Sequence, residues 1–304
     1  MRRYTRTDLA CENMKELQEE GAGIEEKERR VGDFVIRTVR VLDEYAAERI
    51  GMPCGTYLSL ECGCLAMLEE DAETLLVHLL AGELRGIAER LCGKRPDSGL
   101  NVFVAGLGNA EFTVDAVGPK TVSRLTVTRH LREHEEALYR AIGCCALSAL
   151  APGVLGQTGI ETLEILRGAA RVVHPDVMIA VDALAARSCD RLATTIQISD
   201  VGIVPGSGVG NHRGAITEAT MGVPVIAIGI PTVVDSSTLV YDALQKAGIE
   251  SIDDTLRNVL ENGRGFLVSP KDSDQITNRT ADILSRAIGE AFAKALHEKQ
   301  SYFS

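Results

Sequence analysis

The chain has 304 residues, of which 45% are hydrophobic and 4% aromatic, with no Trp and a formal net charge of -11. This length and apolar content predict a substantial core, in one large domain or in one domain with a smaller appendage. The acidic balance argues against nucleic acid as a direct partner, the scarcity of aromatics argues against an all-β sandwich, and no apolar run is long enough to span a membrane.

The cysteines and the N-terminus indicate where the chain is found. The eight cysteines form neither a CxxC pair nor a dense disulfide pattern, and the N-terminus has no apolar signal segment, so a reducing cytoplasm is expected. Cys54, Cys62 and Cys64 could ligate zinc, but their spacing matches no common site, and buried small hydrophobes are the favoured interpretation. No metal and no cofactor are expected.

The pattern of apolar residues predicts alternating strands and helices. Residues 1–30 are polar and are expected to form a tail leading into a solvated helix or loop. The expected strands cover 34–42, 55–63, 101–105, 177–181 and 223–228. The expected helices cover 43–51, 69–92 and 159–167, with others starting near 115, after 233 and from 272 onward. Buried strands separated by helices are typical of a three-layer α/β fold with a central, mostly parallel sheet.

A pair of carboxylates forms a candidate catalytic site. Asp182 ends the strand predicted at 177–181, and Asp115 lies in TVDAVGP after the strand at 101–105. Open α/β sheets bind ligands at the carboxyl ends of their strands, so both side chains are expected at one edge. Two close carboxylates can share a proton, one acting as general base on water and the other as general acid. The alternative is a helix N-cap at Asp115 and a satisfied loop acid at Asp182.

Two glycine-rich segments accompany these aspartates. Gly106, Gly108 and Asn109 resemble a dinucleotide loop, but Glu111 stands where the GxGxxG fingerprint requires Gly or Ala. The second segment follows the polar residues Thr194, Thr195, Gln197 and Ser199 and contains Gly206, Ser207, Gly208, Gly210 and Asn211. The N–H groups of both segments could form an oxyanion hole or bind the substrate backbone, or the glycines could only permit a tight turn. A nonenzymatic protein that holds a phosphate or nucleotide in this loop is a further alternative.

Three other motifs are weak. Asp200-Val201-Gly202 resembles the active-site triplet of pepsin-type proteases, but it occurs once and in an α/β context. Ser207 lies in GSG and not in a GxSxG nucleophile elbow. His130 and His134 have the spacing of a metal pair on a helix, although a surface position is the favoured interpretation.

Long strings of sequence resemble the germination protease family of spore-forming bacteria. They are RTDLACE at 6–12, GLGN at 106–109, TVDAVGP at 113–119, VDALAARS at 181–188, TTIQISDVGIVPGSGVGN at 194–211 and VPVIAIGIPTVVD at 223–235. The resemblance implies an endopeptidase of an atypical aspartic type that starts the degradation of small acid-soluble spore proteins, with Asp115 and Asp182 as its catalytic pair. It also implies a fold similar to that of hydrogenase-maturation proteases. In those relatives a histidine and the equivalent carboxylates bind a metal, which leaves a metal-assisted peptidase as an alternative.

The same resemblance implies a zymogen. Residues 1–8 would be a propeptide that the enzyme removes by cutting itself between Asp8 and Leu9, which leaves residues 9–304 as a single catalytic domain. The segment Asp8 to Glu12 fits the substrate pattern of the family: an acid before the cut, then a large apolar residue, Ala, a small residue and Glu. The resemblance further implies a homotetramer in the spore core, with protein substrates and no membrane partner.

Overall fold

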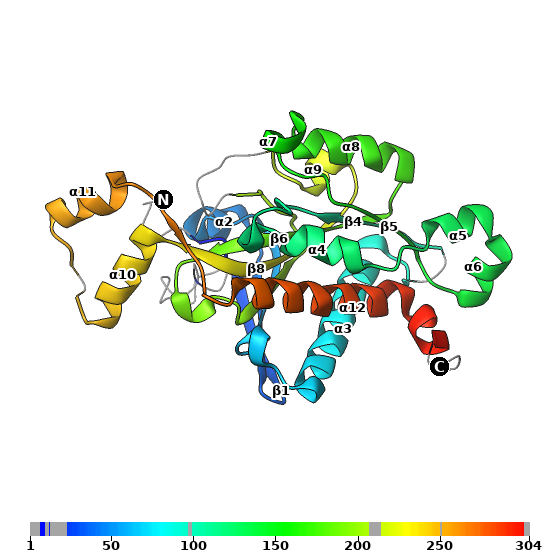
Figure 1. The fold of residues 1–304 in the computed structure, drawn as a ribbon, viewed down its shortest axis with the longest axis horizontal. Coiled ribbons are helices and arrows are strands. Elements are labelled where there is room, and N and C mark those ends of the chain that lie inside the picture. Colours follow the sequence, from blue (N-terminus) through cyan, green and yellow to red (C-terminus); the bar gives the residue numbers. More distant parts are fainter. Residues whose placement is uncertain are drawn as a thin grey trace.

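A computed structural model describes residues 7–9, 12, 23–96, 99–206, 214–249 and 251–300, with side chains up to Ala293 in the last helix. These residues form one sheet with helices against both of its faces (Figure 1). The predicted three-layer α/β fold is therefore confirmed. Within the described residues, no helix is both long and apolar enough to cross a membrane.

The sheet is mixed, with a parallel half and an antiparallel half. Its strands follow the order β1-β2-β3-β7-β8-β6-β4-β5, and β9 pairs with β8. Strands β5, β4, β6 and β8 are parallel, whereas every pair from β8 through β7, β3 and β2 to β1 is antiparallel. The strands are β1 (Ile24–Val31), β2 (Phe34–Val41), β3 (Gly55–Glu61), β4 (Asn101–Gly106), β5 (Ala146–Leu150), β6 (Val177–Ala186), β7 (Thr195–Ser199), β8 (Val225–Asp235) and β9 (Leu267–Val268).

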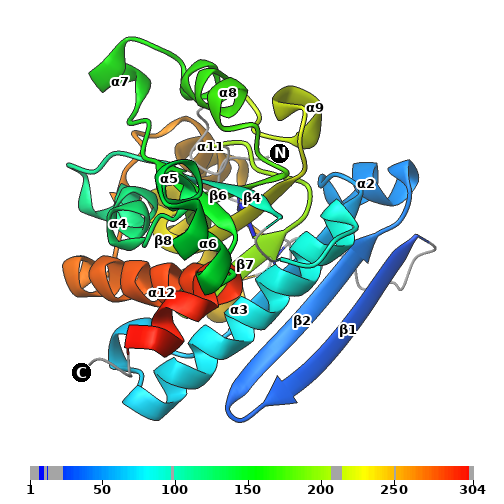
Figure 2. The same cartoon turned by 90° about the vertical axis from the view of Figure 1, so that its right-hand side faces the viewer.

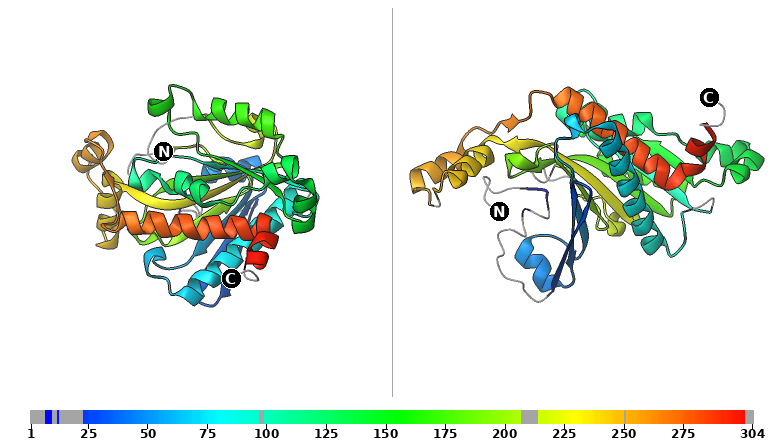
Figure 3. Two further views of the ribbon diagram at one scale, coloured as in Figure 1. Left: turned by 45° about the vertical axis from the view of Figure 1, so that its right-hand side comes forward. Right: turned by 90° about the horizontal axis from the view of Figure 1, so that it is seen from below.

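Helices cover both faces of this sheet. The α-helices are α2 (Glu44–Ile50), α3 (Glu70–Cys92), α4 (Val117–Arg124), α5 (Arg129–His134), α6 (Glu136–Ile142), α7 (Leu155–Thr158), α8 (Thr162–Val173), α9 (Glu218–Met221), α10 (Ser236–Lys246), α11 (Asp254–Asn262) and α12 (Ser273–Gln300). In the part of the chain that the structure describes, three short 3-10 helices join them: η2 (Leu65–Met67), η3 (Thr113–Asp115) and η4 (Cys189–Arg191). Helices α3 and α12 lie on one side of the sheet and α8 on the other (Figures 1 and 2), while α10 and α11 extend away from it (Figure 3).

The two faces of β6 pack into different cores because successive side chains of a strand point to opposite faces. Val177, Ile179 and Val181 belong to the larger core, together with residues of α3 and α12. Met178 and Ala180 belong to a smaller core on the α8 side. All five side chains are fully buried, which agrees with the continuous apolar run in the sequence.

Several predicted boundaries were wrong. Strand β6 does not end at Val181 but continues to Ala186, so Asp182 lies within the strand. The segment expected as a tail, helix or loop contains β1, whose residues are mostly charged and exposed; pairing with β2 at the sheet edge makes it a strand without an apolar pattern. The helix expected near 115 is split into η3 and α4, and the one expected at 159–167 is Thr162–Val173.

Candidate active site

Strand β7 carries buried polar side chains on one face only. Ile196 and Ile198 point into the core beneath α3 and α12. The alternate residues Thr195, Gln197 and Ser199 point to the opposite face, and all three are buried. Buried polar groups need hydrogen-bond partners, so this face must be covered by groups that can supply them.

Asp182 and Gln197 lie in one row across the sheet. Asp182 on β6 and Gln197 on β7 are both register partners of Gly229, on the strand between them. Neighbouring strands are about 4.8 Å apart, so the two Cα atoms are separated by roughly 10 Å with both side chains on the same face. Because Gly229 has no side chain, Leu184 occupies the space beside it: the Cδ1 of Leu184 would lie 2.3 Å from a Cβ added at Gly229.

Asp115 is positioned by the turn that follows β4. Its Oδ2 accepts a hydrogen bond from the Asn109 N–H at 2.8 Å, and the Thr232 hydroxyl of β8 donates to the Val114 carbonyl at 2.7 Å. Gly108 has φ +108°, and a Cβ at this position would lie 2.0 Å from the Asp115 carbonyl oxygen. The N-cap of α4 is Ala116, so Asp115 does not occupy the capping position of that helix.

Both aspartates line one pocket, which has a volume of about 240 Å³. Asp115 contributes from η3 and Asp182 from β6, where its carboxylate is buried and accepts a hydrogen bond from the Ala183 N–H at 2.9 Å. Gly106 is buried at the end of β4, whereas Gly108 and Gly206 lie in the pocket wall. The structure thus brings the two predicted acids together, with a third carboxyl residue, Asp8, at the same pocket.

The N-terminal segment reaches this pocket through Asp8. The Asp8 N–H donates to the Ala185 carbonyl at 3.0 Å, and the Ala185 N–H donates to Asp8 Oδ2 at 2.9 Å. The register between β6 and β8 shifts between Leu184 and Ala185, and such an irregularity disturbs the ladder where Asp8 binds. The amide Nε2 of Gln197 donates to the Asp8 carbonyl oxygen at 3.1 Å. Asp8 is therefore held by its backbone as well as by its carboxylate.

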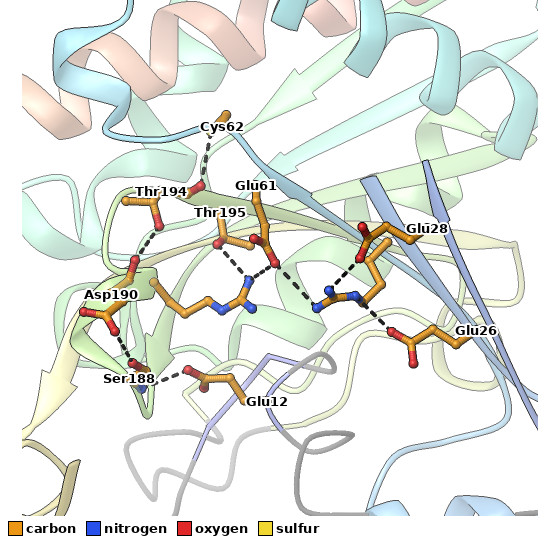
Figure 4. Close-up of polar contacts among 11 residues, drawn as sticks. Glu12, Glu26, Glu28, Glu61, Cys62, Ser188, Asp190, Thr194 and Thr195 are labelled. Atoms are coloured by element: carbon orange, nitrogen blue, oxygen red, sulfur yellow. Dashed lines mark hydrogen bonds and ion pairs between the residues drawn. The ribbon is translucent and has the colours of Figure 1, made fainter. Parts of the chain in front are cut away.

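Leu9 and Glu12 fix the segment beyond Asp8. Leu9 is fully buried in a small apolar cluster with Leu184 and Ala186. Glu12 is also buried: Oε2 accepts from the Arg187 N–H and Oε1 from the Ser188 N–H, each at 2.8 Å. Figure 4 shows the contacts that continue from Glu12 through Ser188 to Asp190, and Glu12 lines a second pocket, of about 670 Å³, beside Arg187 and Ser188.

The remaining predicted residues have different surroundings. The Oδ1 of Asn109 accepts hydrogen bonds from the Glu111 N–H and from Gln157 Nε2. Ser207, Gly208, Gly210 and Asn211 lie outside the described residues. His130 and His134 are exposed on α5, and within the described residues no group of three His, Cys, Asp or Glu could hold a metal ion.

Gln197 has no role predicted from the sequence, where it is one of several polar residues that follow Asp182. The signal was the alternation of Thr195, Gln197 and Ser199 with two isoleucines, which is typical of a strand with one polar face. The length of β6 was missed because its last residues are small: Ala183, Ala185 and Ala186 contribute little to an apolar pattern.

Comparison with known proteins identifies the class of molecule. The chain is 40% identical to a germination protease of Caldanaerobacter subterraneus subsp. tengcongensis, over 97% of this chain and 96% of that protein. It is 37% identical to a germination protease of Clostridium acetobutylicum over 96% of each chain, and 44% identical to that of Bacillus subtilis over 79% of this chain and 66% of the relative. The chain is therefore a peptidase, and its substrates are proteins.

The chain belongs to the germination protease family, whose model matches residues 5–247. The family resemblance inferred from the sequence is thus confirmed. Among solved structures, the [NiFe] hydrogenase maturation protease HycI from Thermococcus kodakarensis KOD1 aligns with a TM-score of 0.35 and 15% identity, covering 66% of this chain and 98% of that one.

Proposed function

We propose that this chain is a zymogen that cuts itself between Asp8 and Leu9 and then acts as an endopeptidase on small acid-soluble spore proteins during germination. The observation that carries the proposal is the position of Asp8, whose backbone is hydrogen-bonded to Ala185 at the pocket lined by Asp115 and Asp182. A segment bound at a pocket with two carboxylates is a candidate for attack by water that these carboxylates activate.

The N-terminal segment is bound in the way a substrate peptide would be. Asp8 is held by backbone and carboxylate hydrogen bonds, Leu9 fills an apolar site, and Glu12 is held by two backbone N–H groups. These three anchors are an acid before the bond, an apolar residue after it and a second acid further on. The same types of residue define the family's substrate pattern, which supports spore proteins as the later substrates.

The aspartate pair supplies the acid and the base of the reaction. Like charges close together cannot both ionise without a large cost, so one carboxyl keeps its proton while the other is ionised. The ionised carboxylate takes a proton from water as the water oxygen attacks the Asp8 carbonyl carbon, and the protonated carboxyl gives its proton to the departing Leu9 nitrogen. The products are a new carboxylate on Asp8 and a free amino group on Leu9.

We further propose an oligomeric state and a cellular location for the active enzyme, and both are supported by the family resemblance. The active enzyme is a homotetramer in the spore core, with residues 9–304 as its catalytic domain. Sedimentation equilibrium of the purified protein tests the assembly. A mass of four chains is expected, and a mass of one chain at micromolar concentration contradicts the tetramer.

The central experiment follows the mass of the full-length chain over time. The expected product lacks residues 1–8 and begins at Leu9; it should form with or without chelator, and not form in Asp182→Asn or Asp115→Asn. Circular dichroism of each variant shows whether it is folded. A folded Asp182→Asn protein that still releases the product at the normal rate would contradict the aspartate mechanism. Loss of cleavage with chelator would indicate a metal-assisted peptidase instead. Addition of a purified small acid-soluble spore protein to the processed enzyme then tests the substrate class.

A further inference from the structure

Gln197 is the side chain that donates to the Asp8 carbonyl oxygen. Its Nε2 lies 3.1 Å from that oxygen, and the residue is only 8% exposed. This oxygen belongs to the peptide bond that joins Asp8 to Leu9, the bond that the proposed function has water attack. Gln197 therefore contacts the substrate at an atom whose charge changes during the reaction.

We propose that Gln197 is a catalytic residue that stabilises the oxyanion formed when the Asp8–Leu9 bond is cleaved. The inference rests on the proposed function, since it takes this bond as the scissile one. It adds a side chain of β7 to the glycine-rich segments as a source of the oxyanion-stabilising hydrogen bond. Donors that stabilise an oxyanion lie 2.7–3.1 Å from the position that the oxyanion will occupy, and Gln197 Nε2 already lies 3.1 Å from the carbonyl oxygen of the uncleaved bond.

The electron movements explain why a fixed amide donor is useful here. When the water oxygen bonds to the carbonyl carbon of Asp8, the π electron pair of the C=O bond moves onto its oxygen, while an aspartate takes the proton of the water. The oxygen then carries a full negative charge, and the hydrogen bond from Gln197 strengthens. When the intermediate collapses, the pair re-forms the C=O bond, the C–N bond breaks, and the Leu9 nitrogen receives its proton from the other aspartate.

The sheet positions the donor relative to the acids. Gln197 and Asp182 flank Gly229 in a single row, so both point to the face on which Asp8 lies. On the other side of Gln197, the same row continues to Ser59 on β3. The ladder fixes the backbone of Gln197, and burial together with the hydrogen bond to Asp8 holds its amide, so little reorganisation is required as charge develops. An amide is also neutral at every relevant pH and always presents an N–H.

The test compares self-cleavage of full-length variants by intact-mass spectrometry. Gln197→Met keeps the length of the side chain without a donor, and Gln197→Glu keeps its shape but offers an acceptor with a negative charge. Removal of one oxyanion donor typically slows catalysis by about 100- to 1,000-fold, so we expect Met to be slower by that factor and Glu slower still. Ser59→Ala, the next side chain in the row, is the matched control and should change the rate by less than about threefold.

A second measurement separates catalysis from simple docking of the segment. Hydrogen exchange at the Ala185 amide, which donates to Asp8, reports how firmly the segment is bound in each variant. The proposal requires the cleavage rate of Gln197→Met to fall far more than the exchange protection does. Equal losses in both measurements would show a role in docking alone and overturn the proposal, as would a normal rate in folded Gln197→Glu. If instead the unmodified chain does not cut after Asp8, or Asp182→Asn cuts normally, the proposed function itself has failed.

Discussion

Gly118 in α4 lies directly against Val181 in β6: a Cβ added at Gly118 would be 2.5 Å from the Val181 carbonyl oxygen. It would also lie 2.4 Å from the carbonyl oxygen of Leu107. The absence of a side chain thus lets the start of α4 sit on the sheet next to the residue that precedes Asp182. Asp115 lies three residues before Gly118, so this close contact helps to bring the two aspartates to one pocket.

We expect Gly118→Ala to destabilise the protein and to slow self-cleavage. The added methyl group would meet backbone atoms, which cannot rotate away, and overpacking of this kind costs about 1–3 kcal/mol. The free energy of unfolding from urea titration measures the first effect, and the rate of Asp8–Leu9 cleavage measures the second.

Gly82→Ala is the control for Gly118→Ala. Gly82 also lies in a helix, α3, but a Cβ added there meets nothing within 4 Å. Replacement of an exposed helical glycine by alanine is expected to stabilise the protein by about 0.5–1 kcal/mol. Equal changes in the free energy of unfolding for the two substitutions would contradict a close backbone contact at Gly118.

We expect Glu12→Gln to slow self-cleavage by about tenfold. The Glu12 carboxylate accepts from the N–H groups of Arg187 and Ser188, and a glutamine would turn an NH₂ group toward one of these donors. A hydrogen bond to a charged group contributes roughly 1.5–3 kcal/mol, so the docked population of the segment should fall. Glu25→Gln, on the exposed strand β1, is the matched control and should leave the rate unchanged. A normal rate in Glu12→Gln would mean that this carboxylate does not help to present the bond.

The sequence was sufficient to predict most of the parallel half of the sheet and the proximity of Asp115 and Asp182, which line one pocket. Long apolar strands such as 101–105 and 177–181 can only be buried between two helical layers, and this condition determines the architecture. The antiparallel half was less predictable because β1 carries charges on both faces and is defined by its pairing with β2. Its strand character depends on a partner and not on its own pattern.

The contacts of the site were harder to predict than its acids. The row that joins Asp182, Gly229 and Gln197 depends on the register of three strands, and 25 residues separate the end of β7 from the start of β8. Turn residues and strand ends do not determine that register. The binding of Glu12 by backbone N–H groups has no sequence signal at all, because any residue can supply an N–H group.

We expect Arg279→Met to destabilise the protein by about 1–3 kcal/mol. Arg279 of α12 donates to Glu73 Oε2 at 2.7 Å and to the Ala66 carbonyl at 2.7 Å, and thereby connects α12 to α3 and to η2. Methionine preserves much of the apolar volume but leaves these acceptors without their donor. Arg140→Met is the control, since Arg140 makes an exposed i,i+4 pair with Glu136 and such pairs contribute about 0.3–0.5 kcal/mol. Similar midpoints of urea unfolding for the two variants would contradict a structural role of Arg279.

The three cysteines of the β3 region should differ in their reaction with iodoacetamide. Cys54 and Cys64 are exposed, whereas Cys62 is buried and its burial raises its pKa to about 12. The thiolate is the reactive form, and a raised pKa keeps Cys62 as the thiol at any pH well below that value. At about pH 8 the folded protein should therefore be alkylated at Cys54 and Cys64 and spared at Cys62, and all three should react in urea. Peptide mass spectrometry measures each site, and modification of Cys62 in the folded chain at the rate of Cys64 would show that this part of the core opens readily to solvent.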